Sequence, residues 1–298
     1  MSTFKHLSPN TREFIDAPKD ERIRKVRKHR WIGYTKANQI ISQLNDLLDY
    51  PTSPRMPNAL IIGATNNGKT DIIRKFEKLH PADPNIGGEA MNIPVLSVQA
   101  PPGPSEAGFY NAILRKLFIK TNLNENPDKK RDKVIGILKE VNLGLIIIDE
   151  IHHLIAGSTK RQKNFLNVIK YLGNELCVPI VGVGTQEAFI AMQSDEQLQN
   201  RFKPVILPKW EYNNEFAKLL MSFERILPLS EPSNLSNKAI ARKILGISEG
   251  AIGEISELIN EAAIYAIKND FPRITEQCLE KCDYLSPYNR KNALNILG

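Results

Sequence analysis

Two glycines, a lysine and a threonine stand at a spacing that could hold a chain of phosphates. Four residues separate Gly63 from Gly68, and Lys69 and Thr70 follow directly, which is the G-x-x-x-x-G-K-[ST] pattern. Glycines let the backbone turn tightly and direct its N–H groups at a phosphate. Lys69 can reach the β- and γ-phosphates, and the Thr70 hydroxyl can ligate Mg²⁺. The predicted nucleotide-binding residues here are Gly63, Ala64, Thr65, Asn66, Asn67, Gly68, Lys69, Thr70 and Asp71.

The flanking sequence supports this interpretation over a chance Gly-Lys-Thr in a surface loop. The apolar run Ala59–Ile62 predicts a buried strand before the loop. Asp71–Leu79 predicts a helix after it, whose N-terminal end would add positive charge at the phosphates. Strand, loop and helix are therefore in the order that the motif requires.

A second apolar run ends in two acidic residues. Leu145–Ile148 predicts a strand buried on both faces, and Asp149 and Glu150 follow it. Ligands of an open parallel sheet bind beyond the carboxyl ends of its strands, so both acids should face the phosphates. Asp149 suits Mg²⁺, directly or through water, and Glu150 suits a general base that polarises the attacking water. The alternative is a strand that ends in two exposed acids. An Asp-Glu pair favours hydrolysis over transfer to a hydroxyl.

Two later residues could complete this chemistry. Thr185 follows the strand signal Pro179–Gly184 and could hydrogen-bond the γ-phosphate or the attacking water, although a simple cap of the strand end is equally compatible. Arg201 precedes the last strand signal, Val205–Leu207. It should lie on the outer surface, where it could act in trans on a neighbour's nucleotide as an arginine finger, or form a surface salt bridge.

The N-terminal region carries a basic run. Asp20–Arg30 holds six lysines and arginines within nine positions. This run is either a solvated helix face or an arm that contacts DNA phosphates or a partner. Trp31 and Tyr34 follow, and they could cover an adenine base or anchor the arm to the core.

Histidine and cysteine positions give little support for a structural metal site. His152 and His153 are adjacent, so we expect their side chains to point apart and to serve structural or interface roles. The three cysteines are Cys177, Cys278 and Cys282. This odd count without a C-x-x-C pair argues for a reducing compartment.

Bulk composition narrows the class of protein. The 298 residues are 42% hydrophobic, which is ample for a packed core, and the net charge of +7 is compatible with nucleic acid without requiring it. No apolar run approaches the roughly 20 residues of a membrane span. The N-terminus has no apolar signal region. We therefore expect a cytoplasmic protein with no membrane partner.

The order of predicted elements indicates an α/β fold. Five strand signals alternate with helices, and only helical patterns follow from Lys209 onward. We predict a basic arm (1–34), a P-loop nucleotide-binding core with a five-stranded parallel sheet (35–208) and a small helical lid (209–298).

These motifs together resemble the AAA+ ATPases, and more specifically the TniB family of transposition ATP-binding proteins, relatives of the TnsC and MuB target-selection regulators. The resemblance extends from about Arg30 to the end of the lid. It rests on RMPNALIIGATNNGKT, HRWIGYTKA, GLIIIDEIHHL, GVGTQEA, DEQLQNRF and SEGAIGEISELINEAAIYAI.

The resemblance implies a cytoplasmic ATPase that uses ATP and Mg²⁺ and assembles as rings or filaments on double-stranded DNA. Its implied partners are the DNA, a transposase, a TniQ-type targeting protein and further copies of itself. In such relatives, loops on the inner face of the assembly follow the DNA. Ser105 lies in one matching region, where a relative has a basic residue, so Lys129, Lys130 and Arg131 are substitute candidates.

The lid departs from the AAA+ pattern. Many relatives carry Gly-x-x-Arg, whose arginine senses the γ-phosphate, whereas this chain has Gly250 to Gly253 followed by Glu254. We therefore expect slow, assembly-dependent hydrolysis. Alternatives are a replication-type AAA+ loader or initiator, a P-loop phosphotransferase and a nucleotide-binding scaffold that does not hydrolyse.

Overall fold

The computed structural model describes residues 4–88, 90–122, 125–154, 159–193 and 195–292. The chain divides into two compact units. One comprises residues 36–65 and 69–207, and we call it the core unit. The other comprises residues 1–35, 66–68 and 208–298, and we call it the helical unit.

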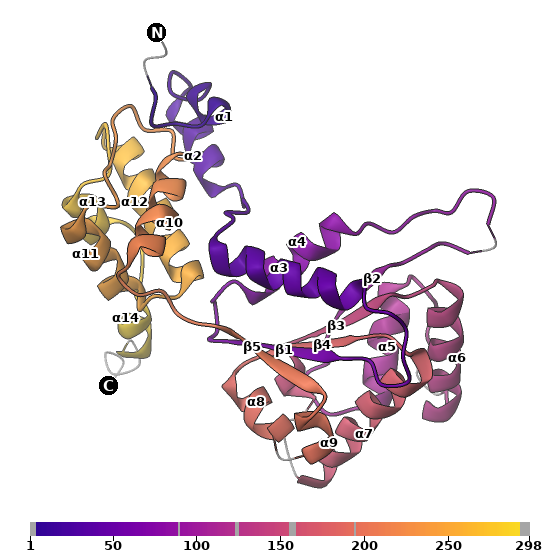
Figure 1. The fold of residues 1–298 in the computed structure, drawn as a ribbon. Coiled ribbons are helices and arrows are strands. Elements are labelled where there is room, and N and C mark those ends of the chain that lie inside the picture. Colours follow the sequence, from indigo (N-terminus) through magenta and orange to yellow (C-terminus); the bar gives the residue numbers. More distant parts are fainter. Residues whose placement is uncertain (1–3, 89, 123–124, 155–158, 194, 293–298) are drawn as a thin grey trace. The chain divides into compact units, whose positions relative to one another are not determined.

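The core unit is built on a five-stranded sheet in the order β2-β3-β4-β1-β5 (Figure 1). Every printed pairing is parallel, and the α/β class with a five-stranded parallel sheet is confirmed. The strands are β1 (Asn58–Gly63), β2 (Val95–Gln99), β3 (Leu145–Asp149), β4 (Ile180–Gly184) and β5 (Phe202–Leu207). Because all five run the same way, their carboxyl ends lie at one edge of the sheet.

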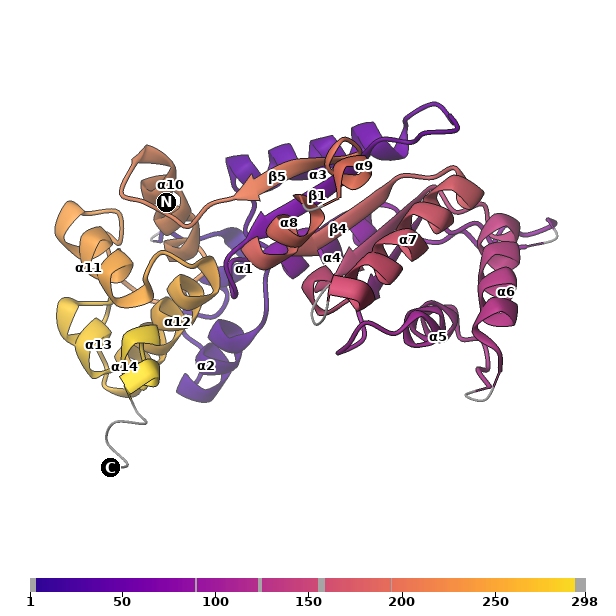
Figure 2. The ribbon, with the colours of Figure 1, turned by 90° about the horizontal axis from the view of Figure 1, so that it is seen from below.

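Helices cover both faces of the sheet, as parallel strands require. On one face lie α3 (Thr35–Leu48) and α4 (Lys69–Leu79), and on the other lies the group from α5 to α8 (Figures 1 and 2). That group is α5 (Glu106–Lys116), α6 (Pro127–Glu140), α7 (Thr159–Leu176) and α8 (Gln186–Gln193). The short η1 (Ile151–His153) and α9 (Glu196–Gln199) complete the unit. Leu145 to Ile148 of β3 are 0% exposed between these layers.

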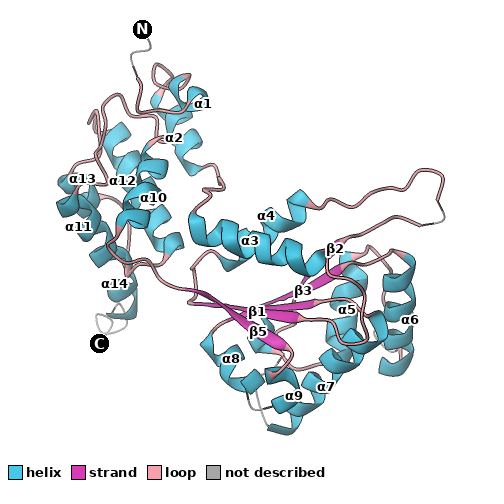
Figure 3. Ribbon diagram, in the orientation of Figure 1, coloured by secondary structure: helices cyan, strands magenta, loops and turns pink. Residues whose placement is uncertain are grey.

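The helical unit packs around one long helix. Its described elements are helices and loops (Figure 3), namely α1 (Pro9–Arg12), α2 (Lys19–Arg27), α10 (Asn214–Glu224), α11 (Lys238–Ser248), α12 (Ile252–Lys268), α13 (Glu276–Lys281) and α14 (Pro287–Asn292). Helix α12 contacts α2, α11 and α13. Its buried face carries leucine, isoleucine and alanine side chains with almost no exposure.

The basic run of the N-terminal region belongs to this unit and is partly committed to it. Val26 joins the apolar cluster around α12. Arg22 donates to the carbonyl of Pro228 at 2.7 Å, and Arg30 donates to the carbonyl of Ile226 at 2.7 Å. Burial lowers the pKa of both guanidiniums. These two arginines therefore hold the N-terminal segment against the unit, which limits any DNA-contacting role to the other basic residues of the run.

No helix in the described part of the chain has the length and apolar character that a bilayer crossing needs.

We predict that truncating an exposed side chain on β5 destabilises the core unit far less than truncating a buried side chain on β3. Ile147→Ala should lower the free energy of unfolding by about 2–5 kcal/mol, because Ile147 is 0% exposed between two neighbouring strands. Ile206→Ala should change it by less than about 0.5 kcal/mol, because Ile206 is 60% exposed. Urea denaturation measures both values. Equal losses would contradict the assigned burial of β3.

Candidate active site

The phosphate loop connects β1 to α4 by a tight reversal. Gly68 has φ +81°, a left-handed conformation that favours glycine. A Cβ on Gly63 would lie 3.0 Å from the carbonyl oxygen of Leu207 on the neighbouring strand β5. Both glycines are therefore required by the backbone path, in agreement with their place in the motif.

Lys69 folds back over its own loop. Its Nζ donates to the carbonyls of Gly63 at 2.9 Å and Ala64 at 2.8 Å, and the residue is only 6% exposed. Burial lowers the pKa of this ammonium, while the nearby carboxylates of Glu150 and Asp149 act in the opposite direction. The ammonium is thus held at the loop by two neutral carbonyl oxygens. A phosphate oxygen can replace these acceptors and would attract the ammonium more strongly, because it is charged.

Thr70 and Asp149 meet at the carboxyl edge of the sheet. The Thr70 hydroxyl donates to Oδ2 of Asp149 at 2.8 Å, although the two residues are 79 positions apart in the chain. Asp149 is 8% exposed, and its Oδ1 accepts from the backbone N–H of Glu150 at 2.9 Å. A hydroxyl and a carboxylate are hard oxygen donors of the kind that Mg²⁺ takes beside phosphates. The residues present therefore fit this ion.

A cleft of about 680 Å³ opens beside this pair. Its lining includes Thr70 and Asp149 from the phosphate side and Arg74, Arg115 and His153 from the surrounding elements. Most of its walls come from the carboxyl ends of strands and from α4 and α5, the position at which open parallel sheets bind ligands. The Thr70–Asp149 pair is thus accessible to a metal ion and solvent.

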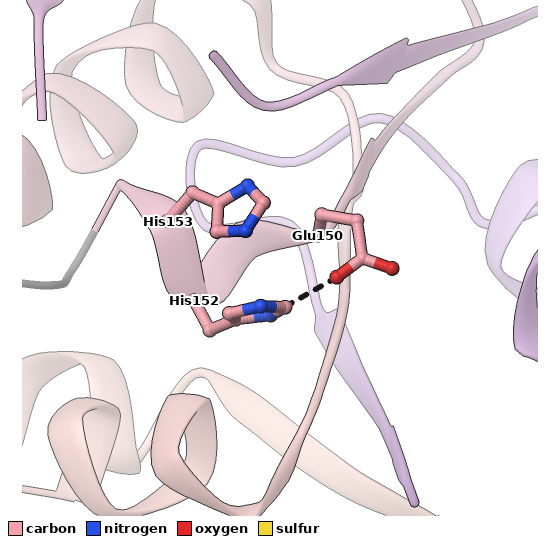
Figure 4. Close-up of side chains that lie close together, drawn as sticks. All are labelled: Glu150, His152 and His153. Atoms are coloured by element: carbon pink, nitrogen blue, oxygen red, sulfur yellow. Dashed lines mark ion pairs between the residues drawn. The ribbon is translucent and has the colours of Figure 1, made fainter. Parts of the chain in front are cut away.

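Glu150 occupies a strained position and has a histidine partner. Its φ of +55° is left-handed, which is uncommon for a residue with a side chain. Figure 4 shows Glu150, His152 and His153 gathered on one turn, with His152 Nδ1 3.2 Å from Oε2 of Glu150. The two imidazole rings are 4.4 Å apart. We expected the histidine side chains to point apart, and that expectation is wrong because η1 is a tight 3₁₀ turn that brings both beside the acid.

Thr185 lies where the sequence places it, just beyond the carboxyl end of β4. In the sheet, β4 stands between β3 and β1, so Thr185 is at the same edge as Asp149 and the phosphate loop. Its hydroxyl donates to Oε2 of Glu187 at 2.6 Å. A γ-phosphate or an attacking water would have to compete with Glu187 for this donor, and the sensing role of Thr185 stays a prediction.

Arg201 lies at the opposite end of the sheet from the phosphate loop of its own chain. Its carbonyl accepts from the N–H of Asn58, at the start of β1. Gly63, at the far end of β1, pairs with Leu207 of β5. The intervening strand is roughly 20 Å long. Arg201 Nη1 donates to Oδ1 of Asn174 at 3.0 Å, and at this position it is unable to serve its own site.

The aromatic pair upstream of the loop belongs to the helical unit, as do loop residues 66–68. The Tyr34 hydroxyl lies 3.9 Å from the position that a Cβ would take on Gly68. The Tyr34 ring packs edge-on against Trp210, with centroids 5.1 Å apart. Trp31 is half-buried. An adenine-covering role for Trp31 and Tyr34 stays a prediction, and Tyr34 is already placed beside the loop.

The substitute DNA-contacting residues on α6 need one correction. Lys130 is only 1% exposed, so it is not available to a DNA phosphate, and its assignment is wrong. It lies on the buried face of α6 together with Val134 and Leu138, at the four-residue spacing of a helix. Lys129 is exposed. Arg131 pairs with Asp128 at 2.8 Å, which leaves Lys129 as the more available cation.

Ser105 has a local structural role. Its Oγ accepts from the N–H of Gly108 at 3.0 Å and so caps the N-terminus of α5. The residue is exposed. A role in DNA contact stays a prediction, and a basic side chain at this position would lose the cap.

Sequence reasoning missed one residue at the loop. Glu254, on α12, accepts a hydrogen bond from the side chain of Asn66 at 2.8 Å. These two residues are 188 positions apart, and no spacing in the sequence indicates their contact. The only signal was the presence of an acid just after the point where relatives carry the lid arginine.

We predict that Thr70→Val selectively removes the magnesium dependence of nucleotide handling. Hydrolysis should fall at least about 100-fold, because the hydroxyl that complements Asp149 is lost. Nucleotide affinity in EDTA should match the unchanged chain, because the backbone cradle is intact. Fluorescent-nucleotide titrations with and without Mg²⁺ test this. Thr52→Val, on an exposed loop threonine, is the matched control. A magnesium response in Thr70→Val equal to that of the control would refute the assigned ligand.

Comparison with known proteins places this site in a family. No curated protein matches the chain. Among solved structures it is similar to the Aeropyrum pernix ORC2 protein, at 16% identity and a TM-score of 0.61 over 87% of this chain and 70% of that one. It is also similar to the A. pernix ORC1 protein in complex with DNA, at 14% identity and a TM-score of 0.57. This likeness covers 87% of this chain and 67% of the ORC1 chain. It is similar as well to the Thermotoga maritima RuvB Holliday junction branch migration motor, at 17% identity and a TM-score of 0.52. That likeness covers 92% of this chain and 80% of the motor chain.

These likenesses show a shared fold, the one used by the AAA+ ATPases, and they agree with the sheet order and the phosphate loop. The family described as bacterial TniB protein matches residues 22–212, which is more than half of the chain and includes the loop, Asp149, Glu150, Thr185 and Arg201. The chain therefore belongs to the bacterial TniB protein family and is an ATPase of the AAA+ fold.

Proposed function

We propose that this protein is an ATP-dependent regulator of DNA transposition that assembles on duplex target DNA and recruits or activates a transposase. The observation that carries the proposal is the match of residues 22–212 to the TniB family together with an intact hydrolytic site. The transposase and a TniQ-type targeting protein enter as partners through the family resemblance. The target DNA is the surface on which these partners meet.

The core residues divide the chemistry among them. The loop N–H groups and Lys69 bind the phosphates, and Thr70 and Asp149 hold Mg²⁺, which supplies positive charge to phosphate oxygens when it is bound. Glu150 polarises the attacking water. His152 Nδ1 lies 3.2 Å from this carboxylate, a distance at which a protonated imidazole would form an ion pair with it.

Assembly of several copies completes the site. Arg201 lies at the amino ends of the strands, whereas the phosphate loop of its own chain lies at the carboxyl ends. Arg201 can therefore serve only the nucleotide of another copy. Its fixed guanidinium fork suits the negative charge that develops during phosphoryl transfer. This arrangement makes hydrolysis depend on a ring or filament.

Duplex DNA is the proposed surface for this assembly. The protein carries a net charge of +7, and phosphate contacts by lysine and arginine make binding strongly dependent on salt. The solved ORC1 structure to which the chain is similar is a complex with DNA. Lys129 and the exposed basic residues of the N-terminal run are the candidate contacts, with Ser105 as a further surface position.

A replication-type loader or initiator is the second candidate, because the fold likeness includes two ORC proteins. The family match favours transposition over this alternative. A P-loop phosphotransferase is disfavoured by the adjacent Asp149 and Glu150, which suit water as the acceptor. In a reconstituted reaction, a regulator of transposition should change the insertion of a transposon end, whereas a loader should deposit a ring-shaped client on DNA.

We predict that Glu150→Gln traps the ATP-bound assembly on DNA. Hydrolysis should fall by about 100-fold or more because the general base is lost, while ATP binding is retained. Electron microscopy with ATP and duplex DNA should show persistent oligomers, and binding should weaken steeply as salt rises. Glu140→Gln, at an exposed position at the end of α6, is the control and should leave turnover on DNA near the unchanged rate. A scaffold that never hydrolyses would show no difference between the two variants.

We predict that Arg201 acts between copies. Arg201→Ala and Lys69→Ala should each be inactive alone, and a mixture of the two should regain hydrolysis. The first variant binds ATP, and the second supplies the arginine at the shared interface. Lys203→Ala, an exposed neighbour on β5, should stay active alone. A mixture with no recovered activity, despite mixed oligomers seen by crosslinking, would refute the trans assignment.

A further inference from the structure

We propose that Glu254 is a positioning residue of the phosphate loop, which holds the loop tip, through Asn66, in the shape that receives nucleotide. The tip, residues 66–68, belongs to the same compact unit as α12. The inference rests on the ATP binding of this chain and adds a residue that the phosphate-loop motif does not contain.

Four hydrogen bonds fix the tip to the start of α12 and to Pro208, which precedes α10. Asn66 donates through Nδ2 to Oε1 of Glu254 at 2.8 Å, and the carbonyl of Asn66 accepts from the N–H of Gly253 at 2.9 Å. Asn67 donates to the carbonyl of Pro208 at 3.0 Å and accepts from the N–H of Ile252 at 3.4 Å. Asn67 is only 2% exposed.

The fit at this contact is too close for most other residues. Asn66 has a left-handed φ of +57°, a conformation that a firm side-chain contact can maintain. A Cβ on Gly253 would lie 2.0 Å from Oδ1 of Asn66. A side chain at position 253 would therefore displace the Asn66 amide from its place beside Glu254.

Glu254 is a buried carboxylate with a full set of partners. Its side chain is 8% exposed, and it accepts from the Tyr284 hydroxyl at 2.6 Å and pairs with Arg290 of α14. Burial alone would raise the pKa of this acid, but hydrogen bonds from Arg290, Tyr284 and Asn66 hold the pKa below its ordinary value. The carboxylate is therefore charged at neutral pH and acts as a strong acceptor for Asn66.

This position links the carboxylate to nucleotide affinity rather than to the chemical step. The loop binds phosphates through its backbone N–H groups, whose directions depend on the shape of the tip. Glu254 holds that shape before nucleotide arrives, so its loss adds an ordering cost to binding. Glu150 and Asp149, which carry the reaction, belong to the core unit and keep their own contacts.

A double-mutant cycle tests the proposal. Asn66→Ala and Glu254→Ala should each weaken ATP-analogue binding about tenfold, with kcat nearly unchanged and KM raised. The double variant should also lose about tenfold rather than about a hundredfold, because both single changes remove one contact. Fluorescence titration gives the affinities, and steady-state hydrolysis gives the split between KM and kcat.

Two further variants separate positioning from stability. Glu224→Ala removes another carboxylate of the helical unit, which accepts from the N–H groups of Asn234 and Leu235. It should lower Tm and leave nucleotide affinity within about twofold. Glu254→Gln keeps an acceptor oxygen for Asn66 and should recover part of the affinity lost in Glu254→Ala, which covers the case in which the alanine variant does not fold.

The outcomes distinguish the positioning role of Glu254 from the ATP binding on which that role rests. Additive losses in the double variant, unchanged affinity in Glu254→Ala, or equal affinity losses in Glu224→Ala and Glu254→Ala would overturn the positioning role. If Glu254→Ala does not fold, unchanged affinity in Asn66→Ala likewise overturns the role. Failure of the unchanged protein to bind ATP would instead refute the nucleotide site itself.

Discussion

The parallel register of β1, β3 and β4 is the constraint on which the core chemistry depends. It brings the ends of three strands that are far apart in the chain to one edge, and there Thr70 donates to Asp149 at 2.8 Å. The same register places Arg201 at the amino end of β5, away from the phosphate loop of its own chain. One arrangement of strands therefore accounts both for the residues that gather around a nucleotide and for the arginine that does not join them.

Charge burial at two points follows a common rule. The buried Lys69 ammonium donates only to neutral loop carbonyls, which an anion can replace. The buried Glu254 carboxylate accepts hydrogen bonds from Tyr284 and Asn66 and pairs with Arg290. An ion removed from water is tolerable only with such partners. The exchangeable partners of Lys69 suit a ligand site, and the fixed partners of Glu254 suit a support for that site.

Local patterns predicted the parts of the structure that depend on local geometry. The phosphate loop and the acids after β3 follow from short spacings, and their strands are the ones buried on both faces. The strand before Leu207 was predicted as Val205–Leu207 and begins earlier, at Phe202. Pro204 hid this start, and it is tolerated because β5 lies at the edge of the sheet, where a missing N–H breaks no ladder on the outer side.

Other features depend on contacts that no spacing encodes, or on a spacing that was overlooked. Asn66 and Glu254 meet across 188 positions, and the turn that gathers His152 beside Glu150 requires the actual backbone angles. Lys130 is different, because its four-residue relation to Val134 was visible in the sequence. A lysine in register with an apolar face can bury its stem and its charge, and cationic character alone was a poor guide to DNA contact.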